Sequence, residues 1–203
     1  FPYTTLFRSS ILAIASILVR VMGMIYRIPM TAIIGDKGNG FYSYAYSVYT
    51  ILLLLSSYSL PLAVSKMVSA KAQLGQWRNV KRVFICAIAF AIGIGTTFGL
   101  IVLIGAQFFT RVFFHSELAA IALRFMAPTI LIMALLGVFR GFFQGLQNTL
   151  PTAVSQIVEG LINAIMSVVF AYFLFDFGHG MDVVSGTTDL GYAWGAAGGA
   201  IGT

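Results

Sequence analysis

The sequence predicts an all-α fold, a polytopic membrane bundle of about six transmembrane helices. Of its 203 residues, 59% are hydrophobic and 9% are charged, whereas an average soluble domain carries about 25% charged residues. So few charges cannot give a globule a polar surface, and lipid is therefore the natural solvent of the chain. The apolar stretches are continuous and do not alternate, which disfavours a β-barrel.

The first nine residues, FPYTTLFRS, are expected to be foreign to the protein. They are the translation of an oligonucleotide that looks like a common sequencing adapter; the alternative is a short natural N-terminus. Residues 1–9 are therefore excluded from the functional argument. The chain is expected to be a fragment, because its last residues, GAAGGAIGT, read as the start of another membrane helix.

A transmembrane helix needs roughly 20 mainly apolar residues, and no soluble domain fits between the stretches that meet this requirement. We expect spans at residues 10–34, 41–64, 83–108, 119–143 and 151–175, with a sixth span beginning near residue 190.

The first span carries Arg20 and Arg27, seven residues apart with Gly23 between them, so all three share one helical face. A charge at bilayer depth costs about 2.5–3.5 kcal/mol even on the lenient insertion scale. The functional interpretation is a cationic face turned toward an anionic substrate. The alternative is that both side chains reach the membrane interface, which is harder for Arg20 near the middle of the span. Pro29 is expected to bend this helix.

The second span contains Tyr42, Tyr46 and Tyr49. We interpret them as part of an aromatic belt at the membrane interface, with stacking on a substrate as the less favoured alternative.

The segment between the second and third spans sets the orientation. It is rich in basic residues and contains no acid, which is typical of a cytoplasmic loop. These basic residues are Lys66, Lys71, Arg78, Lys81 and Arg82. Alternation then places residues 35–40, 109–118 and 176–189 outside, where acids outnumber bases, and it predicts a cytoplasmic N-terminus.

The fourth span ends in a polar face formed by Arg140, Gln144 and Gln147, which are spaced by four and three residues. The segment QNTLP then turns the chain, and Pro151 suits the first turn of the next helix. A polar turn that caps two helices would explain QNTLP, but it would not explain Arg140.

The fifth span carries a polar stripe, with side chains recurring every three or four residues along one helical face. The stripe consists of Thr152, Ser155, Glu159, Asn163 and Ser167. Such a face turns toward a bundle interior or an aqueous cavity. Glu159 is therefore a candidate to bind a proton or cation, or to pair with Arg140 or Arg20. In the sixth span, Gly191, Gly195 and Gly199 are four residues apart, a pattern of close helix packing.

Other classes of function find little support. The net charge of +6 comes from basic residues dispersed beside apolar runs, which predicts no nucleic-acid partner. The sequence contains no Walker A motif, no glycine-rich dinucleotide loop and no cluster with the spacing of a catalytic triad or metal site. We therefore predict no cofactor and no enzymatic activity.

Three segments resemble a known family. RGFFQGLQNTLPTAVSQIVEG is similar to the inner turn between helices four and five in polysaccharide flippases of the multidrug/oligosaccharidyl-lipid/polysaccharide exporter superfamily. LVRVMGMIYRIPMTAIIGDKGNGFYSYAYSVY resembles their first helix, outer loop and second helix. LPLAVSKMVSAKAQLGQ resembles the cytoplasmic loop that follows. The most similar branch looks like the stage V sporulation protein B-like and MurJ-like flippases, and the resemblance covers nearly all of residues 10–203.

The resemblance implies a two-lobe transporter in a bacterial cytoplasmic membrane, with residues 10–203 forming most of the N-terminal lobe. It implies alternating access, a lipid-linked oligosaccharide substrate held between the lobes, contact with membrane lipids and a coupling ion. Arg20 matches a helix-one arginine that lines the cationic cavity of such proteins, whereas Arg27 is displaced by one residue from the pattern. The family has an acid where this chain has Gly40 and Phe41, and arginines in helix two where this chain has none. These departures put lipid II itself in doubt, but not lipid-linked glycans as a class.

Two alternatives remain open at this point. A drug/cation antiporter of the same superfamily would favour a cavity dominated by acids, whereas arginine predominates here. A membrane-embedded glycan transferase would need clustered catalytic acids at an outer loop, and the acids at 176–189 show no such motif.

Overall fold

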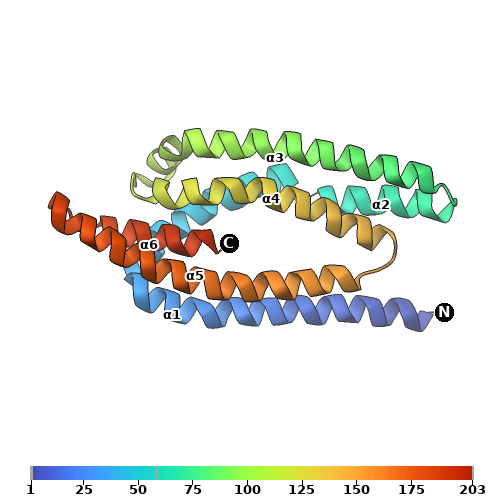
Figure 1. Ribbon diagram of the computed structural model, residues 1–203, viewed down its shortest axis with the longest axis horizontal. Helices are drawn as coiled ribbons and strands as arrows, with labels where there is room; N and C mark the ends of the chain where they lie inside the picture. Colours follow the sequence, from blue (N-terminus) through green and yellow to red (C-terminus); the bar gives the residue numbers. More distant parts are fainter. Residues whose placement is uncertain (1, 58, 203) are drawn as a thin grey trace.

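A computed structural model shows an elongated all-helical bundle (Figure 1), which confirms the all-α part of the predicted fold class. The structure describes residues 2–57 and 59–202, with side chains from 10–56 and 59–202. The side chains of residues 1–9, which we expect to be foreign, lie outside the described part. The helices are α1 (Pro2–Ser57), α2 (Leu60–Gln73), α3 (Trp77–Phe114), α4 (Ala119–Gly145), α5 (Leu150–Ser185) and α6 (Leu190–Ile201).

Four helical stretches among the described residues are long and apolar enough to cross a membrane. They cover Ser10–Gln73, Trp77–Phe114, Ala119–Gly145 and Leu150–Ser185. Many apolar side chains on their outer faces are exposed, such as Ile104 and Phe108. Exposed apolar surface of this extent is characteristic of a protein that meets lipid. About six spans remains a prediction, since the first stretch doubles back and α6 is short.

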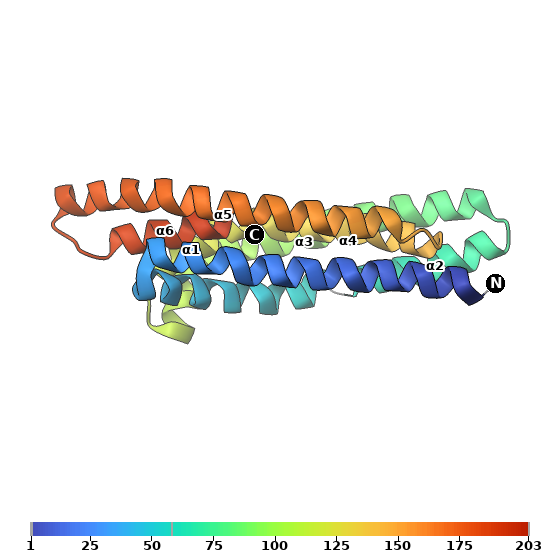
Figure 2. The same ribbon diagram turned by 90° about the horizontal axis from the view of Figure 1, so that it is seen from below.

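Helix α1 is bent at Gly35, which adopts φ 63° and ψ −176°, a conformation that glycine reaches without steric cost. Figures 1 and 2 show that the first limb (residues 10–34) and the second limb (36–57) run in opposite directions. The expected loop at 35–40 is thus a bend within one helix. The break lies six residues after Pro29, and a bend at Pro29 itself stays a prediction.

The second predicted span, 41–64, is divided between the second limb of α1 and α2. Pro61 lies in the first turn of α2, where its missing N–H costs no helical hydrogen bond. The expected loop at 65–82 is also mostly helical, because α2 and α3 are joined only by residues 74–76. Hydropathy predicts the end of a membrane span where charged residues begin. The helix itself can continue past that point into the polar membrane interface.

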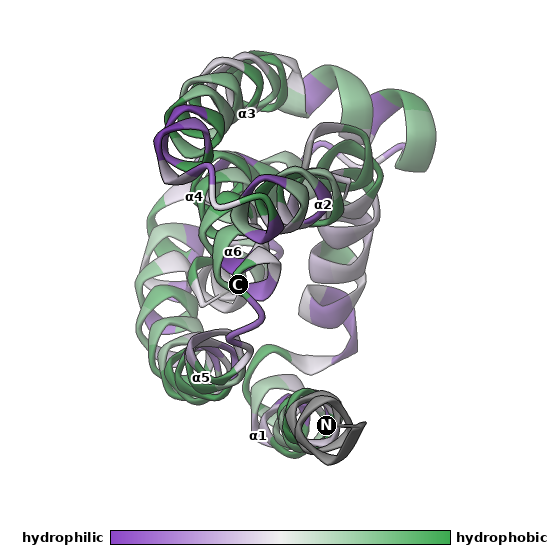
Figure 3. Cartoon of the chain, turned by 90° about the vertical axis from the view of Figure 1, so that its right-hand side faces the viewer, coloured by the Kyte–Doolittle hydropathy of each residue, from purple (hydrophilic) through white to green (hydrophobic). Residues whose placement is uncertain are grey.

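Buried apolar residues form two clusters, one where α1, α3 and α4 meet α5 and α6, and the other between α2, α3 and α4. In the first cluster α6 packs between α4 and α5, as the end-on view in Figure 3 shows. The small residues of α6 permit this close approach. A Cβ atom at Gly195 would lie 2.8 Å from Cγ2 of Ile34, and one at Gly199 would lie 2.8 Å from Cε of Met30, so these two glycines of the predicted face pack against the first limb of α1, whereas Gly191 lies against α5. Gly198 faces the backbone of α5 at Phe170.

The connections gather at two opposite ends of the bundle. Figures 1 and 2 show the N-terminus, the α2–α3 connection and the α4–α5 connection at one end. The bend of α1, the α3–α4 connection and the α5–α6 connection lie at the other end. The basic residues of 65–82 belong to the first end, and a salt bridge between Lys37 and Asp189 (3.0 Å) joins two segments of the second.

Candidate functional site

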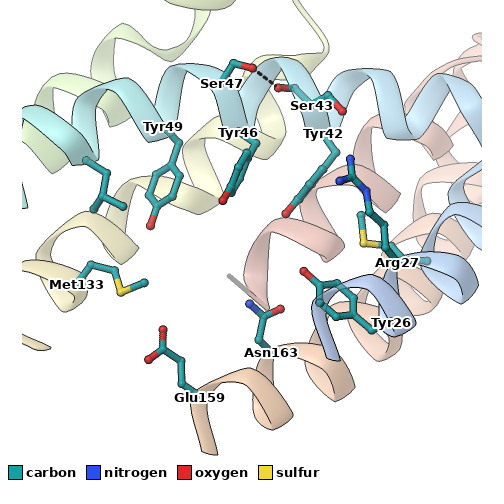
Figure 4. Close-up of a pocket in the computed structure, with 13 residues that line it drawn as sticks. Tyr26, Arg27, Tyr42, Ser43, Tyr46, Ser47, Tyr49, Met133, Glu159 and Asn163 are labelled. Atoms are coloured by element: carbon teal, nitrogen blue, oxygen red, sulfur yellow. Dashed lines mark hydrogen bonds between the residues drawn. The ribbon is translucent and has the colours of Figure 1, made fainter. Parts of the chain in front are cut away.

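Two adjoining cavities lie between the limbs of α1 and helices α4 and α5. The larger has a volume of about 430 Å³ and the smaller about 300 Å³, and Glu159 and Asn163 line both. The larger cavity, drawn in Figure 4, is also lined by Gly23, Tyr26, Arg27, Met30, Tyr42, Ser43, Tyr46, Ser47, Tyr49, Leu53 and Met133. The smaller is also lined by Ser16, Val19, Arg20, Arg140, Gln156 and Gly160.

The first limb of α1 turns its cationic face toward these cavities. Arg20 lines the smaller cavity, and Arg27 and Gly23 line the larger one, as their seven- and four-residue spacings allow. A Cβ at Gly23 would meet no atom within 4 Å, so the glycine leaves open space there. Among the side chains that the structure describes, neither arginine pairs with a carboxylate.

Arg140 and Glu159 form an ion pair between α4 and α5. A guanidinium N–H of Arg140 donates to a carboxylate oxygen of Glu159, and Arg140 Nε also lies 3.5 Å from Oγ of Ser155. The two charged side chains are only 18% and 34% exposed. Of the two arginines expected as partners of Glu159, the structure therefore pairs it with Arg140. Both side chains of this ion pair line the smaller cavity.

The polar stripe of α5 faces into the bundle. Thr152 and Ser167 are buried, and Oγ of Ser167 lies 2.9 Å from Oδ1 of Asn163 and 3.2 Å from the carbonyl oxygen of Gly199. Ser167 thus ties the stripe to α6. Gln144 is half-buried but lines neither cavity, so it is not brought together with Arg140 and Glu159 there. Gln156, which lies between the stripe residues Ser155 and Glu159, lines the smaller cavity although it was not predicted to.

The second limb of α1 contributes a wall of tyrosines. Figure 4 shows Tyr42, Tyr46 and Tyr49 projecting from this limb toward Glu159 and Asn163 on the opposite side of the cavity. The structure thus places these rings against the larger cavity, where only the less favoured stacking interpretation had put them. Their spacing of four and three residues predicts that the three rings share one helical face, but it does not predict whether that face points to the lipid or to the interior of the bundle.

Sequence reasoning passed over two other residues. Tyr26 lines the larger cavity beside Arg27, and no pattern singled it out. Arg124 is a further arginine within the fourth predicted span, yet it is exposed and lines neither cavity.

Charge and shape together define what the cavities can bind. Three guanidinium groups, from Arg20, Arg27 and Arg140, face the space against the single carboxylate of Glu159. Arginine holds phosphate oxygens through paired N–H donors, so the smaller cavity suits a phosphate-like anion. No group of three potential metal ligands occurs among the described residues.

Comparison with known proteins gives one family and several relatives. The family described as "Polysaccharide biosynthesis protein" matches residues 8–185. The chain is 26% identical over 200 residues to a protein called lipid II flippase MurJ from Bacillus subtilis, a match covering 94% of this chain and 37% of the relative. It is 27% identical over 152 residues to stage V sporulation protein B of the same organism, covering 75% of this chain and 29% of the relative.

A third relative, the uncharacterized membrane protein YabM of Bacillus subtilis, is 25% identical over 164 residues. The chain therefore spans about a third of the length of these curated relatives. No solved structure matches it significantly.

Proposed function

Because the chain belongs to the polysaccharide biosynthesis protein family, we propose that it forms the N-terminal lobe of a flippase for undecaprenyl-pyrophosphate-linked oligosaccharides. The substrate would be lipid II or a related polysaccharide unit, carried across the bacterial cytoplasmic membrane by alternating access. About six helices of residues 10–203 would form this lobe, and a second lobe would close the cavities from the opposite side. The relatives named as flippase and sporulation protein support this assignment.

The observation that carries the proposal is the cationic lining of cavities within a lipid-facing bundle. A pyrophosphate bears about two negative charges, which Arg20 and Arg140 are suited to bind in bidentate geometry. Arg27 adds positive potential in the larger cavity. The head group would occupy these cavities, while the polyprenyl tail would remain among the apolar outer faces of the helices.

Glu159 suggests how binding leads to movement. Glu159 neutralises Arg140 across the α4–α5 hairpin. A pyrophosphate would compete for the same guanidinium and release the carboxylate, which weakens one link between the two helices. A ligand shifts a conformational equilibrium only through such a difference in its contacts with the two states.

A second function, a drug/cation antiporter, is favoured by one observation. Glu159 and the tyrosines line the same cavity, and a carboxylate with aromatic rings can bind an organic cation. Against this, Glu159 is already paired with Arg140, and Arg27 would repel a cation from the same wall.

Substituting Arg20 tests the proposal. In proteoliposomes that contain the complete gene product, Arg20→Ala is expected to reduce flipping of an undecaprenyl-pyrophosphate-linked disaccharide about 10–100-fold, the size of a lost charge-assisted hydrogen bond. Arg20→Lys should restore part of the rate, since it keeps the charge and loses the paired donors. Arg124→Ala is the matched control, because Arg124 is an exposed arginine that lines neither cavity.

Equal flipping by wild type and Arg20→Ala would refute the anion site. Efflux of an organic cation that depends on Glu159, with no flipping by the wild type, would favour the antiporter instead.

A further inference from the structure

We propose that the larger cavity is a carbohydrate subsite, in which a pyranose ring stacks on Tyr46 and hydrogen-bonds with the Tyr49 hydroxyl and the Asn163 amide. This inference rests on the proposed function and deepens it, since it separates recognition of the glycan from recognition of the pyrophosphate. It assigns the glycan to the second limb of α1 and the pyrophosphate to the arginines of the smaller cavity.

The tyrosine wall has the geometry of a stacking platform. The rings of Tyr42 and Tyr46 are stacked, with centroids 5.8 Å apart and planes 16° apart. The rings of Tyr46 and Tyr49 are 6.0 Å apart and inclined by 42°. Tyr46 is 44% exposed while its two neighbours are buried, so Tyr46 is the ring of this wall that a ligand in the cavity can reach. The C–H groups of a pyranose carry partial positive charge and pack on the negative face of such a ring.

A buried polar group at this wall lacks a partner. Tyr49 is only 3% exposed, and its hydroxyl oxygen has no hydrogen-bond partner among the described residues. An unsatisfied buried hydroxyl is unfavourable and calls for a bound ligand or water. Because the side chain lines the cavity and projects toward it (Figure 4), a ligand hydroxyl there would satisfy it.

The opposite wall supplies complementary groups. Asn163 faces the tyrosines in Figure 4, and its amide offers donors and an acceptor to sugar hydroxyls. Its Oδ1 already lies 2.9 Å from Oγ of Ser167, which fixes the orientation of the amide. The volume of about 430 Å³ falls within the range of about 300–1,000 Å³ typical of small-molecule sites.

The chemistry of the wall selects a neutral polyol. Aromatic rings also attract cations, but Arg27 lines the same cavity and would repel one. A purely apolar ligand would leave the amide N–H groups of Asn163 and the Tyr49 hydroxyl without a ligand partner. A sugar joined to a pyrophosphate meets both requirements, because Glu159 and Asn163 belong to both cavities and the two ligand parts are covalently linked.

Binding of two lipids in nanodiscs tests the subsite. The probes are undecaprenyl pyrophosphate and the same lipid carrying a disaccharide, each titrated against the complete gene product. Tyr46→Ala is expected to weaken binding of the disaccharide lipid about three- to tenfold, the range of one aromatic contact. Tyr49→Phe keeps the ring and should weaken the same lipid about fivefold through the lost hydrogen bond. Neither variant should change binding of the bare lipid.

The matched control is Tyr44→Ala. Tyr44 lies on the same limb but stacks on Phe114, with centroids 4.7 Å apart, and it does not line the cavity. This variant should bind both lipids like the wild type. Tyr46→Phe should also retain disaccharide binding if the ring face is the binding element.

The outcomes separate this inference from the proposed function. If the wild type binds neither lipid, the proposed function fails and the subsite fails with it. If the wild type binds both lipids, but Tyr46→Ala and Tyr49→Phe weaken them equally or not at all, the subsite alone is overturned. Preferential binding of tetraphenylphosphonium over the disaccharide lipid would also overturn it.

Discussion

The Arg140–Glu159 pair joins two helices in the wall that faces the proposed ligand. A partly buried ion pair gains little net stability, because desolvation of both groups offsets their attraction. The position of the pair therefore matters more for function than its contribution to stability. Glu159 neutralises Arg140, whereas Arg20 and Arg27, the other two cavity arginines, have no carboxylate partner among the described side chains. Two roles for Glu159 follow, as a competitor of the ligand phosphate or as the carrier of a coupling proton.

The variant Glu159→Gln distinguishes these roles. If Glu159 competes with phosphate for Arg140, its removal leaves a permanent anion site, so the variant should discriminate less between pyrophosphate- and monophosphate-linked lipids. The pH dependence of its flipping should match the wild type, because no coupling proton is lost. Flipping assays across the physiological pH range, with each lipid, measure both properties.

A variant whose pH dependence disappears together with uphill transport would identify Glu159 as the proton carrier instead. One that matches the wild type in rate, selectivity and pH profile would refute both roles.

At residue scale, the sequence predicted polar placements better than aromatic ones. Arg20, Arg27 and the α5 stripe could be assigned to an interior face because charged and polar groups are too costly to leave in lipid. Tyr46 could not, because tyrosine is also favourable at a membrane interface. Only the bend at Gly35, which reverses α1, turns the tyrosines of the second limb toward α5.

At the scale of elements, α6 is positioned against α5 mainly through contacts of its own backbone, and large side chains contribute little. The carboxylate of Asp182 accepts hydrogen bonds from the backbone N–H groups of Leu190 (3.0 Å) and Gly191 (2.7 Å), which satisfies two donors at the start of α6. Further along, Gly198 faces the backbone of Phe170 so closely that a Cβ would overlap its carbonyl oxygen. The sequence pattern of glycines predicted close packing, but the neighbouring Gly198, outside that pattern, is the glycine that lies against the backbone of Phe170 in α5.

Substitution of Gly198 tests this packing. Gly198→Ala should force α6 away from α5 and lower the free energy of unfolding by about 1–3 kcal/mol, the usual cost of overpacking. Thermal or denaturant unfolding in detergent measures the change. Gly180→Ala is the control, because a Cβ there would meet nothing within 4 Å, and alanine favours a helix by up to about 1 kcal/mol. Equal stability of Gly198→Ala and wild type would show that α6 is not packed as described.

The boundaries of the elements show where sequence reasoning ends. Hydropathy located the long apolar helices, because a lipid environment demands continuous apolar segments with internally satisfied backbones. The third predicted span, 83–108, is shorter than the helix at both ends, since α3 runs from Trp77 to Phe114. Hydropathy also mistook the bend at Gly35 for a loop, because a single glycine can reverse a helix without any polar segment.

For the whole molecule, the distribution of charge across the bundle supports one orientation. The end that contains the N-terminus and the α2–α3 connection carries the basic residues of 65–82. The opposite end carries Asp182, Asp189 and Glu117 near its connections. Cytoplasmic loops of membrane proteins are enriched in lysine and arginine, so the first end is expected to face the cytoplasm. In that orientation the smaller cavity, lined by Arg20 and Arg140, lies nearer the cytoplasmic end of the bundle than the larger one.

Cysteine accessibility in intact cells tests this orientation. In a background where the exposed Cys86 is replaced by alanine, Gln76→Cys places a thiol on the exposed connection between α2 and α3. An impermeant thiol reagent should label it only after lysis, because the basic end lies inside. Thr188→Cys, on the exposed connection between α5 and α6 at the opposite end, should be labelled in intact cells. The reverse pattern would invert the topology, and labelling of both positions in intact cells would mean that the chain does not cross the membrane as an ordered bundle.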